Sequence, residues 1–233
     1  MKEHQLTFDE RRLHTGRGGP RVGAGRPAAT RPPVHHVRRP PVPKGCPAHV
    51  TLRVRPGLPS LRSKRFVTEF RRTLANGSER GEFRVVEFSI QRDHAHLIVE
   101  AAGKGALGRG MKSVGARFAR AVNRVFERSG PVLHGRYHLH LLCSPREVRN
   151  ALAYVLLNAR KHFRTRTGAA PPVVIDEASS GRWFQGWKRT GRRAAARGRP
   201  TGASPTARAR SWLLRAGWRR HGLIDPAETP GQR

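Results

Sequence analysis

The sequence predicts an α+β domain between residues 46 and 165: a ferredoxin-like (split βαβ) antiparallel sheet with helices packed on it. Two observations support this prediction. Alternation of apolar and polar residues, typical of strands, occurs four times, and apolar residues recur at helical spacing three times. Their order is β-α-β-β-α-β with one more helix at the end of the domain, which is the split-βαβ order. Arg-rich tails flank the domain on both sides.

The first two elements are a strand and a helix. "AHVTLRVRP" (48–56) alternates apolar and polar residues, which predicts a strand. "SLRSKRFVTEFRRTLANG" (60–77) predicts a helix that closes at Asn76-Gly77. Its apolar residues lie on one side of that helix: Leu61, Phe66, Phe70 and Leu74.

A hairpin and a long helix follow. "FRVVEFSI" and "HAHLIVEA" are two strands joined by the short polar "QRD", as expected for a hairpin. The segment 105–130 predicts a helix, because its apolar residues are three or four positions apart. They are Leu107, Met111, Val114, Phe118, Val122 and Val125.

The domain ends with a strand and a well-marked helix. "VLHGRYHLHLL" (132–142) predicts the strand. Ser144, Pro145 and Glu147 then have the spacing of an N-cap, a first-turn proline and a capping box, so a helix is expected over 144–162. One side of it is apolar, and Tyr154 and Asn158 are four apart on the other.

The two flanks have a different composition. Residues 1–45 are dominated by Arg, Pro and Gly, so we expect a disordered basic arm. His35 and His36 lie in it as solvated residues. Residues 166–233 are expected to form a basic, partly helical tail, which contains all four tryptophans: Trp183, Trp187, Trp212 and Trp218. These could stack unpaired bases, or could equally dock the tail on the domain.

The charge indicates a polyanionic partner. The chain of 233 residues has 47 Lys and Arg against 15 Asp and Glu, a formal net charge of +32. Nucleic acid is the natural partner for such a field, because each neutralised phosphate releases counterions. Two cysteines, Cys46 and Cys143, predict no disulfide framework. With no apolar run long enough to span a bilayer, we expect a cytoplasmic, nucleoid-associated protein without membrane contact.

Two histidine pairs draw attention. His94 and His96 are one residue apart in a strand, so both side chains project from the same face. Two such imidazoles could hold one divalent cation, and equally they could be ordinary half-buried histidines. His138 and His140 repeat the pattern in "RYHLHLL". The spacing alone does not decide between the two pairs.

Three segments in succession carry a family resemblance: "RDHAHLIVEA", "MKSVGARFARAVNRVFERSGPVLHGRY" and "ALAYVLLNARKH". Together they resemble the single-tyrosine HUH (IS200-like) transposases, closest to the group associated with repetitive extragenic palindromes (REP). The resemblance implies that His94 and His96 bind Mg²⁺ or Mn²⁺, with Asn158 near or on the metal. It makes Tyr154 the catalytic nucleophile and His138 and His140 ordinary strand residues.

This resemblance also implies the reaction. Members of the family cut single-stranded or hairpin DNA, keep the strand as a 5′-phosphotyrosine, and rejoin it to a 3′-OH; a homodimer is possible. The chain departs from the family pattern at Asp93, at Leu133-His134 and at Ala159. None of these departures removes an implied catalytic group.

Basic residues of the long helix are the expected DNA contacts. Arg117, Arg120, Arg124 and Arg128 form a stripe at spacings of three and four, continued by Arg109 and Lys112. Arg136, in the R-Y element, is added to this set. A plain solvated helix face is the other interpretation.

Two other functions remain open at this level. A non-catalytic, domesticated protein that binds a palindrome or hairpin would share the charge and the fold. An RNA-binding factor on the same ferredoxin-like fold draws support from charge and fold alone.

Overall fold

The computed structural model describes residues 41–188 and 202–230. Both ranges belong to one unit of the chain, Val37–Arg233. The arm expected over residues 1–45, with His35 and His36, lies outside the described residues except for its last five. Within the two ranges, none of the helices has the length and apolar character needed to cross a membrane.

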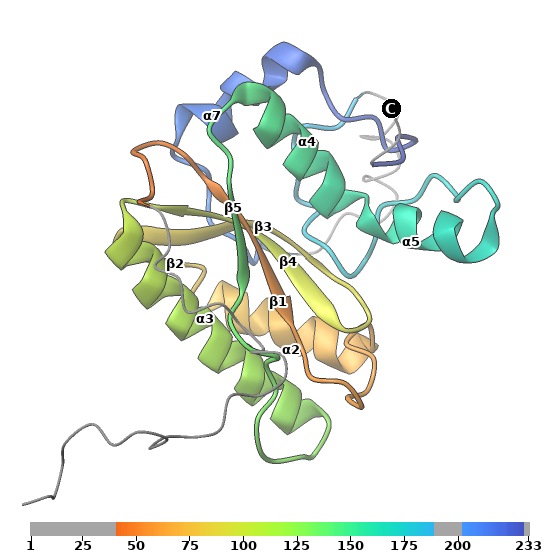
Figure 1. Ribbon diagram of the computed structural model, residues 1–233. Coiled ribbons are helices and arrows are strands. Elements are labelled where there is room, and N and C mark those ends of the chain that lie inside the picture. The colour runs from red at the N-terminus through yellow and green to blue at the C-terminus, as the bar shows by residue number, and fades with distance from the viewer. Residues whose placement is uncertain (1–40, 189–201, 231–233) are drawn as a thin grey trace, which may run out of the picture. The chain divides into compact units, whose positions relative to one another are not determined.

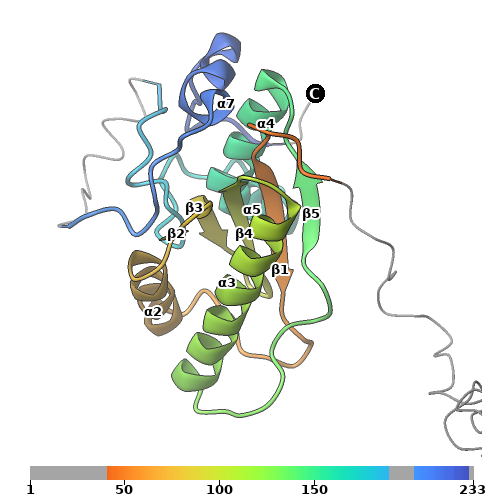
Figure 2. The same cartoon turned by 90° about the vertical axis from the view of Figure 1, so that its left-hand side faces the viewer.

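The sheet has five strands in the order β2-β3-β4-β1-β5, and every neighbouring pair is antiparallel (Figure 2). The strand β4 (His94–Ala101) inserts between β3 (Phe83–Ile90) and β1 (Ala48–Arg53). The edges are β2 (Glu79–Arg80) and β5 (His138–Leu141). This arrangement confirms the α+β, split-βαβ prediction. The last strand is shorter than expected, because residues 132–137 make only an isolated bridge through Leu133 to Val54.

One face of the sheet is packed with aliphatic and aromatic side chains. Two helices cover it, α2 (Lys64–Ala75) and α3 (Lys104–Val125), which lie below the sheet in Figure 1. Phe66, Phe70 and Phe118 are fully buried, and Phe118 meets the other two rings edge to face. We call this the apolar face. Its strand residues are Ala48, Val50, Leu52, Phe88, Ala95, Leu97 and Val99.

The other face carries α4 (Pro145–Leu156) and α5 (Asn158–Thr167) above the sheet (Figure 1). The capping box at Ser144 and Glu147 forms as predicted. The single helix expected over 144–162 is instead broken at Leu157, whose φ of −110° and ψ of 12° leave the helical region. Because of this break, α5 begins at Asn158 as a separate helix.

The C-terminal segment packs on α4 through tryptophans. Trp187 and Trp218 are 1% exposed and lie in one cluster with Val148, Val155 and Leu156. Their indole N–H groups donate to the carbonyls of Gly181 and Leu214. The segment contains the short helix α7 (Trp212–Arg215) and a 3-10 turn, η1 (Gly217–His221). These two buried rings therefore dock the segment and cannot stack on bases.

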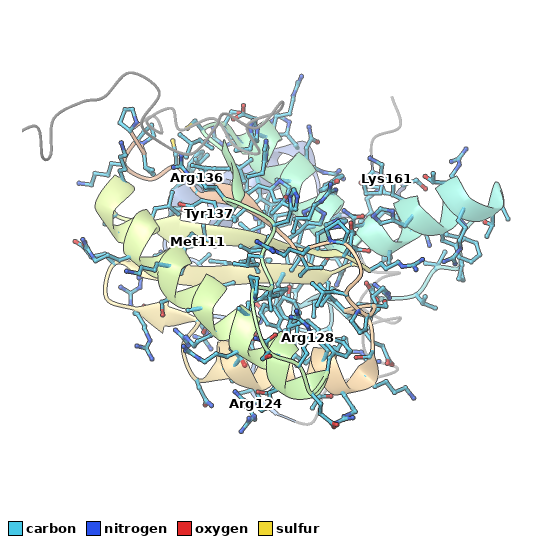
Figure 3. The ribbon with its side chains drawn as sticks, turned by 60° about the horizontal axis from the view of Figure 1, so that its bottom comes forward. Met111, Arg124, Arg128, Arg136, Tyr137 and Lys161 are labelled. Carbon is cyan, nitrogen blue, oxygen red and sulfur yellow. The ribbon has the colours of Figure 1, made fainter. Side chains whose placement is uncertain are left out.

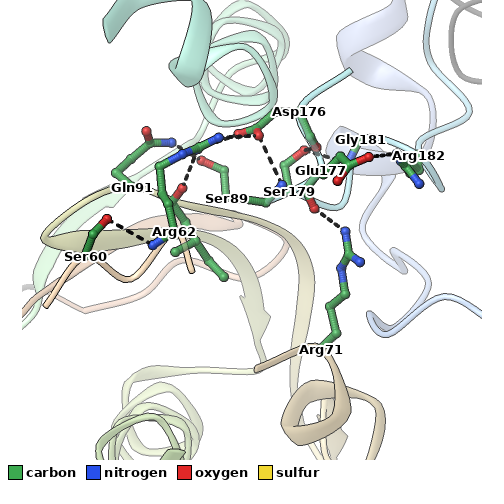
Figure 4. A network of polar contacts seen from close by, with 12 residues as sticks. Ser60, Arg62, Arg71, Ser89, Gln91, Asp176, Glu177, Ser179, Gly181 and Arg182 are labelled. Atoms are coloured by element: carbon green, nitrogen blue, oxygen red, sulfur yellow. Dashed lines mark hydrogen bonds and ion pairs between the residues drawn. The ribbon is translucent and has the colours of Figure 1, made fainter. Parts of the chain in front are cut away.

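A second stretch of the tail runs along β3. Ser180 donates its backbone N–H to Phe88, and Ile90 donates to Ala178, so the stretch extends the sheet beyond β3. Arg62 holds Asp176 in a bidentate pair at 2.7 and 2.9 Å, and Arg71 donates to the carbonyl of Glu177 (Figure 4). This network covers the outer edge of β3.

Candidate active site

The predicted histidine pair lies on the sheet face opposite to α2 and α3. His94 and His96 are 9% and 4% exposed. The register places Thr51 of β1 directly beside His96, and His49 beside Ile98. We call this the histidine face. Its residues on β1 and β4 are His49, Thr51, Arg53, His94, His96, Ile98 and Glu100.

The two predicted metal ligands converge. The Nε2 atoms of His94 and His96 are 3.0 Å apart. Two donors at that separation, each about 2.1 Å from one cation, subtend about 90° at it, which suits an octahedral ion such as Mg²⁺. The pair therefore fits a divalent cation in its donor geometry. Among the described residues, no group of three or more His, Cys, Asp or Glu side chains is placed to hold a metal, so remaining ligands would have to be other atoms.

Each imidazole is oriented through its second nitrogen. His94 Nδ1 lies 2.7 Å from a carboxylate oxygen of Asp93. His96 Nδ1 lies 3.1 Å from both Thr51 Oγ1 and His49 Nε2. The Asp93 carboxylate accepts from His94 Nδ1, and Thr51 Oγ1 and His49 Nε2 can accept from His96 Nδ1 in the same way; a proton held at Nδ1 leaves Nε2 to bind a cation, which is how proteins orient metal-binding histidines.

His96 and His49 are neutral at pH 7. Burial lowers the pKa of His96 to about 2, and the neighbouring imidazoles His49 and His94 add to the effect. Burial likewise lowers the pKa of His49 to about 4, followed by the fields of His140 and His138. A neutral imidazole is the form that binds a metal ion.

Tyr154 of α4 lies against this cluster. Its ring centroid is 5.2 Å from that of His96 and 5.7 Å from that of His49, both in edge-to-face geometry. Lys161 of α5 places its Nζ 5.2 Å from the centroid of the Tyr154 ring. Tyr154 is half-buried. The structure thus brings together the predicted nucleophile and one predicted metal ligand within a single chain.

Asn158, the third predicted metal residue, is fully buried at the start of α5. Neither its Oδ1 nor its Nδ2 has a hydrogen-bond partner within the part of the chain that the structure describes. Leaving a buried amide without a hydrogen-bond partner costs about 1–3 kcal/mol. A ligand that bonds to the Asn158 side chain would remove this cost. No hydrogen bond joins the Asn158 side chain to either imidazole within 41–188 and 202–230, and the break at Leu157 separates it from the regular turn of Tyr154.

Three residues that the sequence analysis passed over belong to the site. His49 and Thr51 contact His96, and His162 of α5 places its ring centroid 5.9 Å from that of His94. The signal for the first two was present: in "AHVTLR" they alternate with apolar residues, so they share a face that is not the core. No pattern marked His162, because its place depends on the break at Leu157.

The second histidine pair lies on the same face. The register sets His138 opposite Thr51 and His140 opposite His49. Both are exposed on the edge strand β5. They are strand residues, as the resemblance implied, one strand away from His96.

A cavity of about 640 Å³ opens beside His94. Its walls come from the β3–β4 turn, from α5 and from the segment 171–176. Cationic and apolar side chains line it together. They include Arg62, Arg92, Arg160 and Arg166 with Leu156, Phe163, Pro172 and Val174.

The basic stripe of α3 lies in the other helical layer, and part of it is used inside the protein. Arg117 donates to the carbonyls of Thr73 and Gly77, which ties α3 to the end of α2. Arg124 pairs with Glu69 of α2 at 2.8 Å.

The remaining basic residues are near the surface. Arg128 donates to the side chain of Asn123, and Arg109 lies 3.9 Å from Glu82. Figure 3 shows Arg124 and Arg128 at one end of α3, away from Lys161 on α5. Lys112, Arg120 and Arg136 are exposed. The structure therefore does not gather the predicted DNA-binding set around the histidines.

Residues 44–155 match the family model described as "Transposase IS200 like". Among solved structures the chain is similar to "Structure of the REP associates tyrosine transposase bound to a REP hairpin", with a TM-score of 0.49 and 17% identity over 76% of this chain and all of the other. No curated protein matches the sequence. The family model confirms the resemblance seen in the sequence, and the residues that it matches include His94, His96 and Tyr154.

Proposed function

We propose that this protein cuts and rejoins single-stranded or hairpin DNA through a covalent bond between Tyr154 and a 5′-phosphate. One observation carries the proposal: the Tyr154 ring is 5.2 Å from the ring of His96, whose Nε2 converges with that of His94. A hydroxyl fixed beside a cation site is what attack on a phosphodiester requires.

The proposed roles follow from the contacts. His94 and His96 would hold Mg²⁺ or Mn²⁺ by Nε2, while Asp93, Thr51 and His49 keep those rings oriented. When bound, the cation would neutralise charge on the scissile phosphate. The Tyr154 oxygen attacks phosphorus, the bond to the 3′ oxygen breaks, and that oxygen takes a proton to leave as a 3′-OH. Reversal by a 3′-OH rejoins the strand without an external energy source, because the phosphotyrosine bond conserves the phosphodiester energy.

The arrangement supports catalysis within one subunit. Tyr154 and His96 belong to the same chain, and their rings already touch. Swinging of α4 or exchange of helices between two copies is therefore not needed to assemble the site. A homodimer remains compatible with this proposal but contributes no residue to it.

The same geometry suggests the path of the strand. The cavity beside His94 combines arginines with an apolar wall of Phe163, Pro172 and Val174, which suits phosphates and bases together. We place the single strand there. Lys112, Arg120 and Arg136 stay as proposed contacts to duplex DNA further from the scissile phosphate, together with Arg109, Arg124 and Arg128, which pair with protein groups as well.

Covalent trapping tests the proposal. The full chain is incubated with Mn²⁺ and a library of DNA hairpins carrying randomised 5′ single-stranded flanks, then denatured and resolved by gel electrophoresis. Label on the 3′ side of the cut should migrate with the protein, and label on the 5′ side should leave as a shorter fragment. Chelation of the metal should abolish both signals.

A matched control is built into the chain, because its only other tyrosine is Tyr137. Tyr154→Phe should lose the adduct and Tyr137→Phe should keep it. An adduct that persists in Tyr154→Phe contradicts the assignment. Tight hairpin binding by the unmodified protein with no adduct for any library member would instead show a non-catalytic hairpin-binding protein.

A further inference from the structure

The chain has two cysteines, 97 positions apart in sequence, and the sheet brings them face to face. The β1–β5 ladder pairs Ala48 with Leu141, and Leu142 N–H donates to the Pro47 carbonyl at 2.8 Å. Continuing this register one position beyond the Pro47–Leu142 pair sets Cys46 opposite Cys143. Pro47 and Leu142 form the hydrogen-bonded pair, so the cysteines take the next, non-hydrogen-bonded position.

That position is the favourable one for a covalent bridge. In a non-hydrogen-bonded antiparallel pair the Cα atoms are about 4.5 Å apart and the side chains approach closely. A disulfide needs a Cα–Cα separation of about 4.4–6.8 Å. The two thiols in fact share a hydrogen bond, and both are free.

The two thiols differ in accessibility. Cys143 is exposed and Cys46 is half-buried. Burial, together with the neighbouring Cys143 and Glu147, raises the pKa of Cys46 to about 11. Small molecules therefore react first with Cys143. Cys46 is less accessible and forms its thiolate less readily, so it reacts second and more slowly.

We propose that Cys46 and Cys143 are a thiol–disulfide modification site that closes into an intramolecular disulfide by exchange with a low-molecular-weight disulfide such as oxidised glutathione. The Cys143 thiolate attacks one sulfur of glutathione disulfide, and a first glutathione leaves as thiolate. The Cys46 thiolate then attacks the Cys143 sulfur, and the second glutathione leaves. Two protein thiols are oxidised and one glutathione disulfide is reduced to two thiolates, which become thiols by taking up the two protons that Cys46 and Cys143 release.

The bridge would join two places that matter for the domain. Cys46 precedes β1, and Cys143 precedes the capping box of α4, donating its N–H to the Glu147 carboxylate at 2.8 Å. Oxidation thereby ties the beginning of the helix that bears Tyr154 to the sheet. The inference does not depend on the proposed DNA chemistry.

The test uses the full chain, exposed to reduced or oxidised glutathione and then acid-quenched. Intact mass should fall by two hydrogen atoms on oxidation, and a non-reducing peptide map should contain the Cys46–Cys143 linked pair. The thermal midpoint should rise, because a cross-link that closes a long loop restricts the unfolded chain. Dithiothreitol should reverse both changes.

Single variants distinguish this outcome from simple thiol capping. Cys46→Ser should keep one glutathione on Cys143, and Cys143→Ser should react slowly. In the unmodified chain the second step should accelerate about tenfold per pH unit between pH 7 and 9, since thiolate formation at Cys46 limits it. A stable glutathione adduct on the unmodified chain, or a disulfide-linked dimer as main product, overturns the proposal.

Discussion

The two faces of one sheet are built from alternate residues of the same strands and do different work. On the apolar face, Leu97 of β4 and Leu52 of β1 are 0% and 2% exposed within a continuous aliphatic and aromatic core. On the histidine face, the neighbouring residues His96 and Thr51 bond to each other. Alternation lets a single six- or eight-residue strand serve stability with one set of side chains and chemistry with the other.

The histidine face is itself divided. Toward the end of β4, the buried carboxylate of Glu100 accepts the backbone N–H groups of Arg210 and Ser211, each at 2.8 Å, so the C-terminal segment closes that end. Toward the start of β4, His94 opens to the cavity. Burial thus keeps His96 and His49 neutral, while the pair stays open to a substrate on the His94 side.

The largest expected effect comes from comparing substitutions of two consecutive residues, one on each face. His96→Ala should reduce adduct formation by more than about 100-fold, because even residues that only orient a metal ligand contribute about 10- to 100-fold. Leu97→Ala, its neighbour, should instead lower the free energy of unfolding by about 2–5 kcal/mol. Trapping assays and denaturant titrations of both variants check this. Equal losses of stability in the two variants would mean that the faces do not divide the work.

The next effect concerns the closed end of the histidine face. Trp218→Ala should lower the free energy of unfolding by about 3–5 kcal/mol, because it removes a fully buried ring between α4 and the tail. Trp212, which is 51% exposed, is the control, and Trp212→Ala should cost under about 1 kcal/mol. Urea titration measures both. A harmless Trp218→Ala would show that the tail is not part of the folded unit.

Glu87, on the histidine face, should make the stability of the fold depend on pH. Burial raises the pKa of Glu87 to about 8, against a small opposing effect of the Ser180 hydroxyl. Between about pH 4.5 and 8 the unfolded chain ionises this group while the folded chain retains the proton, so stability falls as pH rises and then levels off.

Glu87→Gln removes this titration and keeps the shape. The variant should match the unmodified protein near pH 4 and exceed its stability at pH 8 by on the order of 3 kcal/mol. Thermal midpoints measured across that range check the prediction. A constant difference at all pH values would contradict the raised pKa.

The smallest effect is expected at the edge strand. His138→Ala should change adduct formation by less than about twofold, because His138 is exposed and lies beyond Thr51 from His96. The trapping assay under identical Mn²⁺ compares it with His96→Ala. A loss as large as that of His96→Ala would extend the site to β5.

Most of the fold followed from local patterns. The capping box at Ser144, the helix end at Asn76 and the hairpin across "QRD" each depend on residues close in sequence. The strand order also follows, since few topologies connect these elements. The expected length of the last helix was wrong. The helix is interrupted at Leu157, where the sequence has no Gly or Pro to indicate a break.

The candidate residues at the centre of the histidine face were named from the sequence, and those around them were not. His94, His96 and Tyr154 were identified by their motifs, and His96 and Tyr154 are in contact. His49 enters only through strand pairing, which places residues 47 positions apart side by side. The arginines of α3 have regular spacing, but spacing on one helix does not reveal which layer that helix occupies.

Because the chain is interrupted at Leu157, the orientation of α5 relative to α4 depends on the number of residues at this junction. Adding one residue after Leu157 would turn every side chain of α5 by about 100° around the helix axis while leaving Tyr154 in its setting. Lys161 would then leave the tyrosine ring and His162 would leave His94. Substitutions in α5 should thus be tolerated more readily than insertions or deletions at its first turn.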